Sequence, residues 1–459
     1  MKTLHITNYW HDTSGGIARF YTALLETANR RRQEMCLVVP SAKTWTEMVG
    51  EFGKVYHVAA PSAPLNSQYR VLYPTQFLSP GSPLQQILAE EQPDLVEICD
   101  KYSLNYLGAL LRLGLLRGVD FKPVVVAQSC ERMDDNFDSY ITSTTLGRKF
   151  SSFYMRWLYF HFFDHHIANS HYTAEELRPA SQGHPVQRGV WVRTPGVDVE
   201  RFSSTLRSEV VRQQLVTQSG AGRDSVLLLY AGRLVPEKNL PLLVEVAREL
   251  AQDGERDFRL LIAGSGMELD RLRKLAAERA PGKVTFVGHI SSREQLASLY
   301  ANCDVFVHPN PREPFGIAPL EAMASGLALV APNSGGVLSY ANQENAWLAD
   351  AGKPAEFAAA VRQASRQTAG RQAKLDRALE TASSFRWENV VDSLFSLYDD
   401  MVAVAQGSAL QEPPLFFSTN GTASGNRFTR VLGETAKKSF AAAARWNLVP
   451  PPPPTANPR

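Results

Sequence analysis

The stretch VLLLYAGRLVPEKN, residues 226–239, places an apolar run directly before a loop that begins with glycine. Such an almost wholly apolar run is typical of a central strand that is buried on both faces of a parallel sheet. Ligands of doubly wound sheets bind at the carboxyl ends of the strands, where this loop must lie. Arg233 and Lys238 therefore bring two cations to that edge, either to bind a diphosphate or as surface charges around a turn.

The residues that follow repeat the alternation of short apolar runs and helix-period stretches that is typical of parallel α/β domains. Apolar residues at 240, 243, 244 and 247 fall on one helical face. Strands are expected at 226–231, 259–263, 284–287, 305–308 and 327–331, and helices at 240–251, 267–280, 293–300 and 387–404.

The first half of the chain shows the same alternation and predicts another α/β unit. Strands are expected at 4–7, 35–39, 54–58, 95–98, 124–127 and 166–168, with helices at 18–29 and 105–113 among them. Residues 190–202, which contain a Pro-Gly pair, are interpreted as the connection between the units. Because 459 residues exceed one ordinary core, two domains and a tail are expected.

Two glutamates eight positions apart bracket a turn in the sequence EPFGIAPLE, residues 313–321. The glycine-containing loop leads into a run of small residues, and the N–H groups at a helix start bind anions. Glu313 is expected on the loop and Glu321 on the helix, one to two turns below. Carboxylates accept hydrogen bonds from sugar hydroxyls, so the predicted ligand carries a phosphate together with several hydroxyls.

Three further glycine turns follow expected strands, at 263–266, 288–290 and 13–17. Each is weak evidence alone, because such turns occur in many α/β folds that bind nothing there. Glycine does, however, let a backbone approach a ligand closely. Together with the turn at Gly232, they describe a ligand held between two facing domains.

In this order the motifs resemble the retaining GT-B glycosyltransferases of family 4. The resemblance rests on Gly-Gly-Ile, Gly-Arg-Leu-x-Pro-Glu-Lys-Asn, Ile-Ala-Gly-Ser-Gly, Phe-Val-Gly-His and Glu-Pro-Phe-Gly-Ile-x-x-x-Glu; it is strong over residues 190–400 and looser over 1–190. It implies two Rossmann-like, doubly wound domains facing a central cleft. The expected parts are an acceptor domain at 1–190, a donor domain at 191–385, a helix crossing back to the N-terminal domain at 386–405, and a low-complexity, disordered tail at 406–459.

The resemblance also implies a role for individual residues. Arg233 and Lys238 would bind the donor diphosphate and support its departure, while Glu313 would bind hydroxyls of the transferred sugar. Glu321 would bind the ribose. The donor-binding set would be Gly16, Gly232, Gly264, Ile290, Phe315, Gly316, Ile317 and Glu321. Two cations and a helix dipole would replace a metal ion, so no metal and no cofactor beyond the nucleotide diphosphate sugar is expected.

The segment QSCERMDDN, residues 128–136, departs from the family pattern. Many relatives carry a histidine here that faces the reacting sugar, and this chain has none. Cys130 or Ser129 could replace it, Glu131 and Asp134 could bind acceptor hydroxyls, or the loop could lack a direct chemical role. In the resembled family the leaving phosphate assists a front-face attack, so the missing histidine need not abolish activity.

Composition narrows the partners and the location of the protein. A net charge of +2 argues against a nucleic-acid binder that works by bulk electrostatics. The four cysteines lack metal-ligand spacing and are interpreted as reduced, mostly buried thiols of a cytoplasmic protein. The N-terminus is too short in apolar length for a signal peptide, and no run of 18 apolar residues occurs, so any membrane contact is expected to be peripheral.

Two segments leave a membrane contact open. Residues 147–163 are rich in aromatic and basic side chains, which suits either a helix against a bilayer or an ordinary buried helix. Residues 406–426 and 450–459 have the composition of a disordered linker and a polyproline end. Between them, 428–446 could form a short basic helix, which would be either a solvated tail or an anchor.

The sequence therefore predicts a metal-independent, retaining hexosyltransferase, in the cytoplasm or at the inner face of the membrane. It would transfer a hexose, with mannose as the choice that the family favours, to a glycan or lipid-linked acceptor in polysaccharide or glycolipid biosynthesis. The alternatives are a GT-B nucleotide-sugar epimerase or phosphorylase, and a non-catalytic nucleotide-sugar-binding module. Nothing at 264–267 or 290–294 decides between uridine and guanosine.

Overall fold

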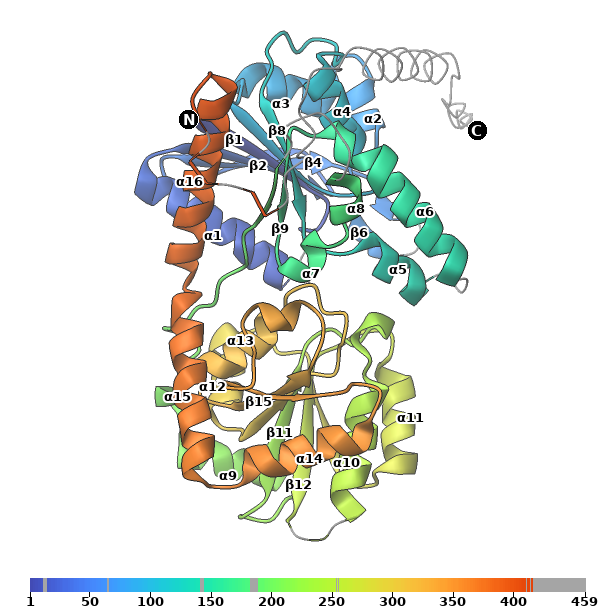
Figure 1. Cartoon of the computed structure of the whole chain (residues 1–459), viewed down its shortest axis with the longest axis vertical. Coiled ribbons are helices and arrows are strands. Elements are labelled where there is room, and N and C mark those ends of the chain that lie inside the picture. Colours follow the sequence, from blue (N-terminus) through green and yellow to red (C-terminus); the bar gives the residue numbers. More distant parts are fainter. Residues whose placement is uncertain are drawn as a thin grey trace, which may run out of the picture.

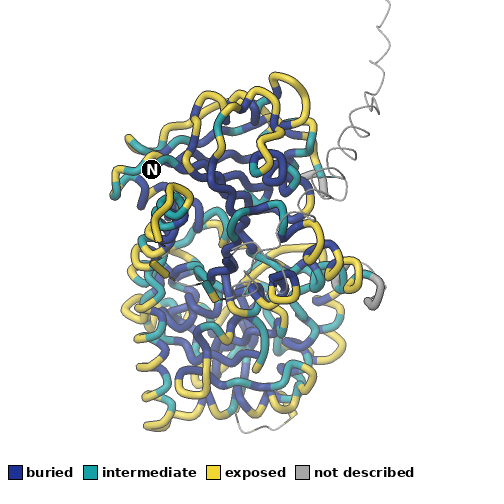
Figure 2. Tube along the Cα trace, turned by 45° about the horizontal axis from the view of Figure 1, so that its top comes forward, coloured by how far each residue is buried: buried dark blue, intermediate teal, exposed yellow. Residues whose placement is uncertain are grey.

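The chain forms two α/β units, each built on a mainly parallel sheet, stacked along the long axis of the molecule (Figure 1). The computed structural model describes residues 1–10, 15–63, 66–140, 144–181, 189–252, 254, 256–409, 411–412 and 414–415. Figure 2 shows that the centre of each unit is buried and that the outer turns are exposed. The expected α/β class with two doubly wound units is confirmed.

The N-terminal sheet has eight strands in the order β10-β9-β8-β7-β1-β2-β4-β3. They are β1 (Lys2–Thr7), β2 (Glu34–Ser41), β3 (Trp45–Val49), β4 (Gly53–Ala59), β7 (Leu95–Cys99), β8 (Val124–Ser129), β9 (His165–Ala168) and β10 (Val190–Val192). All neighbours pair in parallel except β3 and β4. The strand order reverses at β1, and such a switch point opens a crevice at the carboxyl ends of the strands.

Helices cover both faces of this sheet. They are α1 (Gly16–Arg31), α2 (Thr75–Leu78), α3 (Pro83–Glu91), α4 (Asn105–Leu113), α5 (Met133–Tyr140), α6 (Thr144–Trp157), η1 (Tyr159–Phe162), α7 (His171–Ala174) and α8 (Arg178–Ser181). A small hairpin of β5 (Ser62–Ala63) and β6 (Asn66–Arg70) lies apart from the sheet. On one face Phe20 and Leu24 of α1 share a core with Val39 of β2, and on the other Leu107 of α4 packs with Val125 of β8.

The C-terminal sheet has six strands in the order β13-β12-β11-β14-β15-β16, all parallel. They are β11 (Val226–Ala231), β12 (Phe258–Ala263), β13 (Val284–Gly288), β14 (Val305–Val307), β15 (Ala328–Pro332) and β16 (Trp347–Ala349). β11 is buried along its whole length and lies in the middle of the sheet. The sequence prediction of a central buried strand at 226–231 is thus confirmed.

Helices again cover both faces. They are η2 (Ser204–Leu206), α9 (Glu209–Gln218), η3 (Pro236–Lys238), α10 (Pro241–Gln252), α11 (Leu269–Arg279), α12 (Arg293–Ala301), α13 (Ile317–Ala324), η4 (Gly336–Ser339), α14 (Pro354–Ser365) and α15 (Ala369–Ser384). Leu243 and Val246 of α10 bury the apolar side of that helix in one core, and Leu320 and Met323 of α13 lie in the core on the opposite face. This arrangement brings the N-terminus of α13 to the carboxyl edge of the sheet.

The last helix, α16 (Trp387–Ala405), returns to the N-terminal unit and runs alongside it in Figure 1. Its Tyr398 donates a hydrogen bond to the fully buried Glu97, which also accepts from Tyr21 at 3.3 Å. Arg30 and Arg31 of α1 form ion pairs with Asp392 and Asp399 of α16 at 2.9 and 3.0 Å. A buried carboxylate without donors is costly, so this network fixes the crossing helix in place.

Two expectations about the connections were wrong in part. Residues 190–192 are not linker but the edge strand β10, in which Trp191 packs into the core; a three-residue strand leaves no visible period in a sequence. The predicted disordered tail is attached where it begins, because Leu415 N–H donates to the Val190 carbonyl at 2.8 Å and Arg193 pairs with Glu412. The predicted basic helix at 428–446 and the end at 450–459 lie outside the described residues. Within the described ranges, no helix has the length and apolar character needed to cross a bilayer.

Candidate active site

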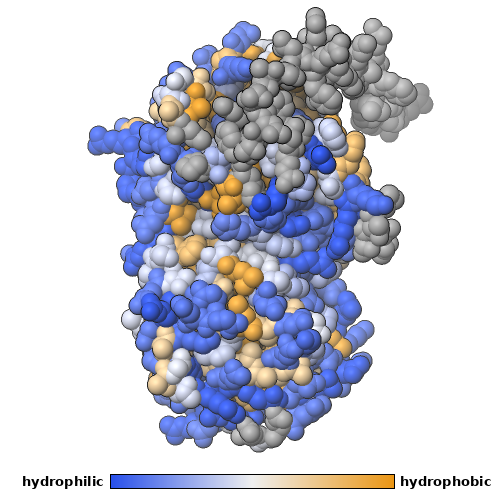
Figure 3. Space-filling view, in the orientation of Figure 1, coloured by the Kyte–Doolittle hydropathy of each residue, from blue (hydrophilic) through white to orange (hydrophobic). Residues whose placement is uncertain are grey.

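A large cleft of about 1630 Å³ separates the two units, and side chains of both line it. Figure 3 shows hydrophobic residues exposed among hydrophilic ones in the region where the two units meet. Thirteen residues of the predicted set line the cleft: Gly16, Cys130, Glu131, Gly232, Arg233, Lys238, Gly264, Ile290, Glu313, Phe315, Gly316, Ile317 and Glu321. Motifs from distant parts of the chain therefore converge on one space.

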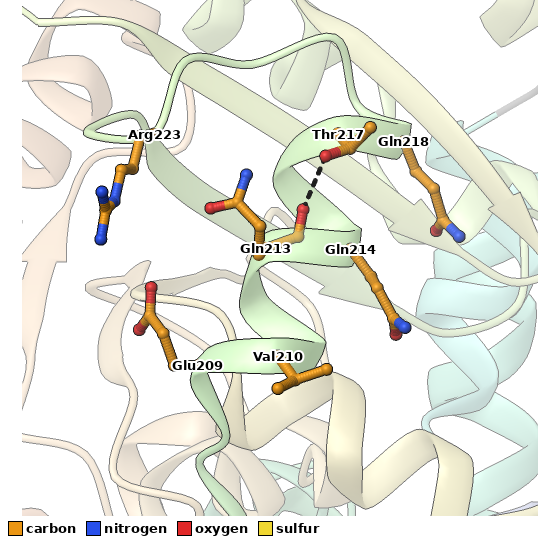
Figure 4. A pocket seen from close by; sticks show the side chains of 7 residues that line it. All are labelled: Glu209, Val210, Gln213, Gln214, Thr217, Gln218 and Arg223. Atoms are coloured by element: carbon orange, nitrogen blue, oxygen red, sulfur yellow. Dashed lines mark hydrogen bonds between the residues drawn. The ribbon is translucent and has the colours of Figure 1, made fainter.

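A second depression of about 620 Å³ lies on α9 (Figure 4). Its lining is Glu209, Val210, Gln213, Gln214, Thr217, Gln218 and Arg223, mostly uncharged side chains of one helix. It brings together no cluster of like charge, so the interdomain cleft is the candidate site.

The loop after β11 and the loop after β12 lie against each other at the cleft. A Cβ at Gly264, whose φ is 149°, would lie 1.9 Å from the Gly232 carbonyl oxygen, so only glycine fits. Asn239 ends η3 in the left-handed region and donates to the Pro309 carbonyl at 2.9 Å, which fixes this loop to the next strand of the sheet. The close packing places Lys238 inside the cleft, whereas the Arg233 side chain is half exposed at its edge.

Glu313 is the centre of a polar cluster. Lys238 Nζ lies 2.9 and 2.8 Å from its two carboxylate oxygens, and Asn310 Nδ2 donates at 3.0 Å. His308 Nε2 lies 3.7 Å from Oε2 of the same carboxylate. Burial is the largest single influence and raises the pKa of Glu313, but the charge of Lys238, the neighbouring His308 and the hydrogen bonds from Lys238 and Asn310 together outweigh it and lower the pKa to about 2. Glu313 is therefore an anion at neutral pH.

His308 and Asn310 were missed by sequence reasoning, although both line the cleft. Burial lowers the pKa of His308 to about 4 against the opposing influence of Glu313, so the imidazole is neutral at pH 7. Both residues follow the end of β14, and their position at the carboxyl end of a central strand was the available signal.

Gly316 begins α13 with a φ of 87°, which requires a residue without a Cβ. Its carbonyl accepts a hydrogen bond from Tyr340 Oη at 2.5 Å. Gly336 N–H donates to the Glu313 carbonyl at 2.6 Å, and a Cβ there would lie 1.9 Å from the Pro314 oxygen. Hydrogen bonds from Tyr340 and Gly336 thus hold the turn in place. Gly316 and Ile317, at the start of α13, line the cleft. Phe315 packs its ring on Tyr340 in the core, so it offers the cleft mainly its backbone.

Glu321 lies one turn into α13, buried, and accepts from Arg293 Nη2 at 3.1 Å. Burial raises its pKa to about 7 despite the opposing charge of Arg293, so this carboxyl titrates near neutrality. The Arg293 guanidinium lies 5.0 Å from the centroid of the Phe202 ring. Arg293 was not singled out in the sequence, because an arginine at a helix start carries no signal of its own.

Of the four residues expected on the acceptor side, Cys130 and Glu131 line the cleft and Ser129 and Asp134 do not. Ser129 is the last residue of β8 and is fully buried. Side chains alternate between the two faces of a strand, so Gln128 and Cys130 line the cleft while Ser129, between them, points into the core. Asp134 does not line the cleft either, because Arg132 holds its carboxylate at 2.6 Å. Glu131 accepts a hydrogen bond from Tyr9 Oη at 2.8 Å.

A buried ion pair supports the acceptor loop. Lys101 Nζ lies 2.6 Å from Glu176 Oε2 and also donates to the Glu131 carbonyl. Glu176 Oε1 accepts from the backbone N–H of Met133 at 2.7 Å and of Asp134 at 3.1 Å. Lys101 and Glu176 thereby fix the start of α5 and the loop before it. Beneath that loop the sulfurs of Cys99 and Cys130 lie 3.5 Å apart, and both thiols are free.

The two units contact each other directly beside these groups. Ser170 Oγ donates to the Pro314 carbonyl at 2.5 Å, and Arg312 pairs with Asp138 at 3.2 Å. A Cβ at Gly16 would lie 2.9 Å from Ile317 Cδ1, so the start of α1 meets the start of α13. Both helix N-termini therefore face one space, which suits a phosphate.

In the part of the chain that the structure describes, no group of three or more His, Cys, Asp or Glu side chains is arranged to hold a metal ion. The charged side chains that line the cleft include Lys238, Arg233 and Arg293 and the two glutamates of the 313–321 motif.

Comparison with known proteins places the chain in a family. The model for glycosyltransferase family 4 matches residues 14–201, and the model for glycosyl transferases group 1 matches residues 211–381. The chain belongs to the family 4 glycosyltransferases of the GT-B fold.

Relatives and solved structures agree with this. A GDP-mannose-dependent alpha-(1-6)-phosphatidylinositol dimannoside mannosyltransferase of Mycobacterium tuberculosis is 27% identical over 362 residues, covering 79% of this chain and 87% of that protein. A D-inositol 3-phosphate glycosyltransferase of Geodermatophilus obscurus is 34% identical over 257 residues, 53% of this chain and 55% of that one. Sucrose-phosphate synthase from Thermosynechococcus elongatus, at 19% identity, matches the fold with a TM-score of 0.68 over 88% of this chain and all of that one.

Proposed function

We propose that the protein is a retaining, metal-independent hexosyltransferase that transfers mannose from GDP-mannose to a lipid-linked or glycan acceptor in glycolipid or polysaccharide biosynthesis. The observation that carries the proposal is the convergence of Arg233, Lys238 and Glu313 at the carboxyl ends of β11 and β14, in a cleft that a family 4 chain forms between its two units. The choice of sugar and base is supported by the GDP-mannose-dependent relatives.

The diphosphate of the donor binds beside Lys238 and Arg233. Negative charge builds up on the nucleoside diphosphate as the glycosidic bond breaks, and preorganised cations stabilise that charge most where water is excluded. Lys238 has only 17% of its side chain exposed, so its charge is weakly screened. The N-terminus of α13 adds N–H groups and a favourable dipole, which together take the role that a metal ion has in other transferases.

Glu313 binds hydroxyls of the transferred hexose, and Glu321 binds those of the ribose. An ionised carboxylate accepts several hydrogen bonds, and those to a charged acceptor are the stronger ones. Lys238 and Asn310 hold Glu313 on both sides, so it is positioned as a hydroxyl acceptor rather than as a mobile nucleophile. Retention then follows from attack on the face that the diphosphate leaves, with a phosphate oxygen taking the acceptor's proton.

The acceptor enters from the N-terminal unit, along the loop that holds Cys130 and Glu131. Gln128 joins this set, because it lines the cleft while almost fully buried and its Oε1 has no hydrogen-bond partner in the structure. An acceptor hydroxyl satisfies such an oxygen. The proposed cellular place is the cytoplasmic face of a membrane, where a lipid-linked acceptor resides.

The experiment is a transfer assay with GDP-mannose, and with UDP-glucose as the competing donor, using extracted lipid acceptors and mass spectrometry of the product. Glu313→Gln and Lys238→Ala should each lower kcat/KM at least about 100-fold. Glu268→Gln, in a surface pair with Arg271, is the control and should retain activity. Full activity in both cleft variants would overturn the assigned site. Loss of activity on adding a chelator would overturn the metal independence.

A further inference from the structure

The outward side of α6 carries large aromatic side chains. Phe150, Phe153 and Trp157 are 54, 57 and 37% exposed, although residues of this kind are usually buried. Their spacing of three and four positions puts them on one side of the helix. Met155 on the opposite side is buried in the core of the N-terminal unit, as is Tyr154, which lies next to Phe150 at the edge of this surface. The expectation of an ordinary buried helix at 147–163 is thus met by only one side of α6.

The same surface is basic. The described part of α6, residues 147–157, carries Arg148, Lys149 and Arg156 and no carboxylate. The Arg156 guanidinium lies 5.3 Å from the centroid of the Trp157 ring. Asp138 of the neighbouring helix already pairs with Arg148 and with Arg312 at 3.2 Å, so it does not offset Lys149 or Arg156. Lys149, Phe150, Phe153, Arg156 and Trp157 are called the α6 face below.

The α6 face lies next to the acceptor side of the cleft. Figure 1 shows α5 and α6 together on one flank of the N-terminal unit, with α5 nearer the C-terminal unit. α6 packs on α5, and α5 also contacts η3, the turn that carries Lys238. Asp135 and Asn136 of α5 line the cleft. A single helix therefore separates the α6 face from the proposed reaction centre.

We propose that the α6 face docks on an anionic lipid bilayer, so that a lipid-linked acceptor reaches the cleft along α5. Aromatic side chains mixed with Lys and Arg are the composition that settles at the headgroup level of a membrane and attracts anionic lipids. The surface is the outward side of a single helix, which suits a bilayer. The inference rests on the lipid acceptor of the proposed function and adds the surface that presents it.

Binding of the whole protein to sedimenting vesicles tests the inference. Vesicles of phosphatidylcholine with phosphatidylglycerol should bind the wild type, vesicles of phosphatidylcholine alone should bind it weakly, and added salt should reduce binding. Phe153→Ser with Trp157→Ser, and Lys149→Glu with Arg156→Glu, should each weaken binding at least about 10-fold. Trp45→Ser with Met48→Ser on β3 is the matched control, because these residues are also exposed, at 48 and 59%.

Unchanged vesicle binding in both α6 variants, or absence of binding by the wild type, would overturn the docking surface. Calorimetric titration with GDP should give the same affinity for the α6 variants as for the wild type, since no residue of the α6 face lines the cleft. If vesicle binding depends on α6 but no mannosyl transfer is found, the docking surface stands and the proposed function fails. If transfer to an acceptor in detergent is intact but vesicle binding does not depend on α6, the proposed function stands and the docking surface fails.

Discussion

Lys238 Nζ lies within 2.9 Å of both carboxylate oxygens of Glu313, although the two residues are 75 positions apart in the chain. The pair joins the loop after β11 to the loop after β14 across the floor of the cleft. Both members are also the groups proposed to bind the donor, the lysine its diphosphate and the glutamate its sugar. The donor can therefore bind through the third N–H of Lys238 and the remaining lone pairs of Glu313, while the pair holds both groups in position.

The first prediction separates the two roles of the pair. Glu313→Gln keeps the shape and removes the charge, so kcat should fall at least about 100-fold, while the affinity for GDP, which lacks the sugar, should stay within about threefold. Lys238→Ala should weaken GDP binding as well. It also leaves a buried carboxylate unpaired, which costs about 3–5 kcal/mol of stability. Steady-state kinetics, calorimetry and chemical unfolding measure these quantities.

Lys283→Ala is the control for Lys238→Ala. Lys283 pairs with Asp257 at 2.8 Å on the surface of the C-terminal unit and does not line the cleft. Its loss should change stability by less than about 1 kcal/mol and leave activity unchanged. Equal effects of the two lysine variants on GDP binding would mean that Lys238 has no special place in the donor site.

The sequence predicted the cleft well where a motif combines a strand end, a glycine and a charge. Gly264 was expected at the cleft and does line it, although its need for glycine comes from the close packing on the Gly232 carbonyl, which the sequence did not predict. It did not predict His308 or Arg293, whose partners are set by loop conformations that no local period encodes. Ser129 failed for a different reason: one step along β8 turns a side chain from the cleft to the core. The exposed strand β3 was also missed, because its apolar residues do not alternate regularly with polar ones.

The second prediction concerns pH and Glu321. Burial raises its pKa from 4.5 to about 7, so the folded chain binds a proton that the unfolded chain releases between these values. Its contribution to stability is complete below pH 4.5 and is lost as the pH rises to about 7. Glu321→Gln should therefore gain stability over the wild type at pH 8, by up to about 3 kcal/mol, and show no gain at pH 4.5. Unfolding in denaturant at several pH values gives the difference.

Ionisation of the Glu321 carboxyl, which lowers stability, should raise the affinity for the donor nucleotide. Glu321 binds ribose hydroxyls better as an anion, so the affinity of the wild type for GDP should rise between pH 6 and 8. Glu321→Gln should bind more weakly and lose most of this rise. A variant that kept the full pH dependence would show that another group, and not Glu321, titrates with the nucleotide.

The third prediction concerns acid and His308. Burial lowers the pKa of His308 from 6.5 to about 4. Between pH 6.5 and 4 the imidazole is therefore protonated in the unfolded chain and neutral in the folded chain. The wild type should lose stability as the pH falls from 6.5 to 4, by at most about 3 kcal/mol from this residue. His308→Gln should lose less over the same interval. Parallel stability curves for the two proteins would contradict a buried neutral histidine.

The last prediction uses the contact between the starts of α1 and α13. A Cβ at Gly16 would lie 2.9 Å from Ile317 Cδ1, whereas a Cβ at Gly15 would meet nothing within 4 Å. Gly16→Ala should therefore push Ile317 aside and lower kcat/KM by about 10-fold, at a cost in stability of about 1 kcal/mol, because the displaced atom is the end of a flexible side chain. Gly15→Ala should leave both quantities unchanged. Ile317→Val removes the obstructing methyl group, so combining it with Gly16→Ala should restore part of the lost activity. If Gly15→Ala and Gly16→Ala behave alike, or the double variant recovers nothing, the fit between these two helix ends does not control the reaction.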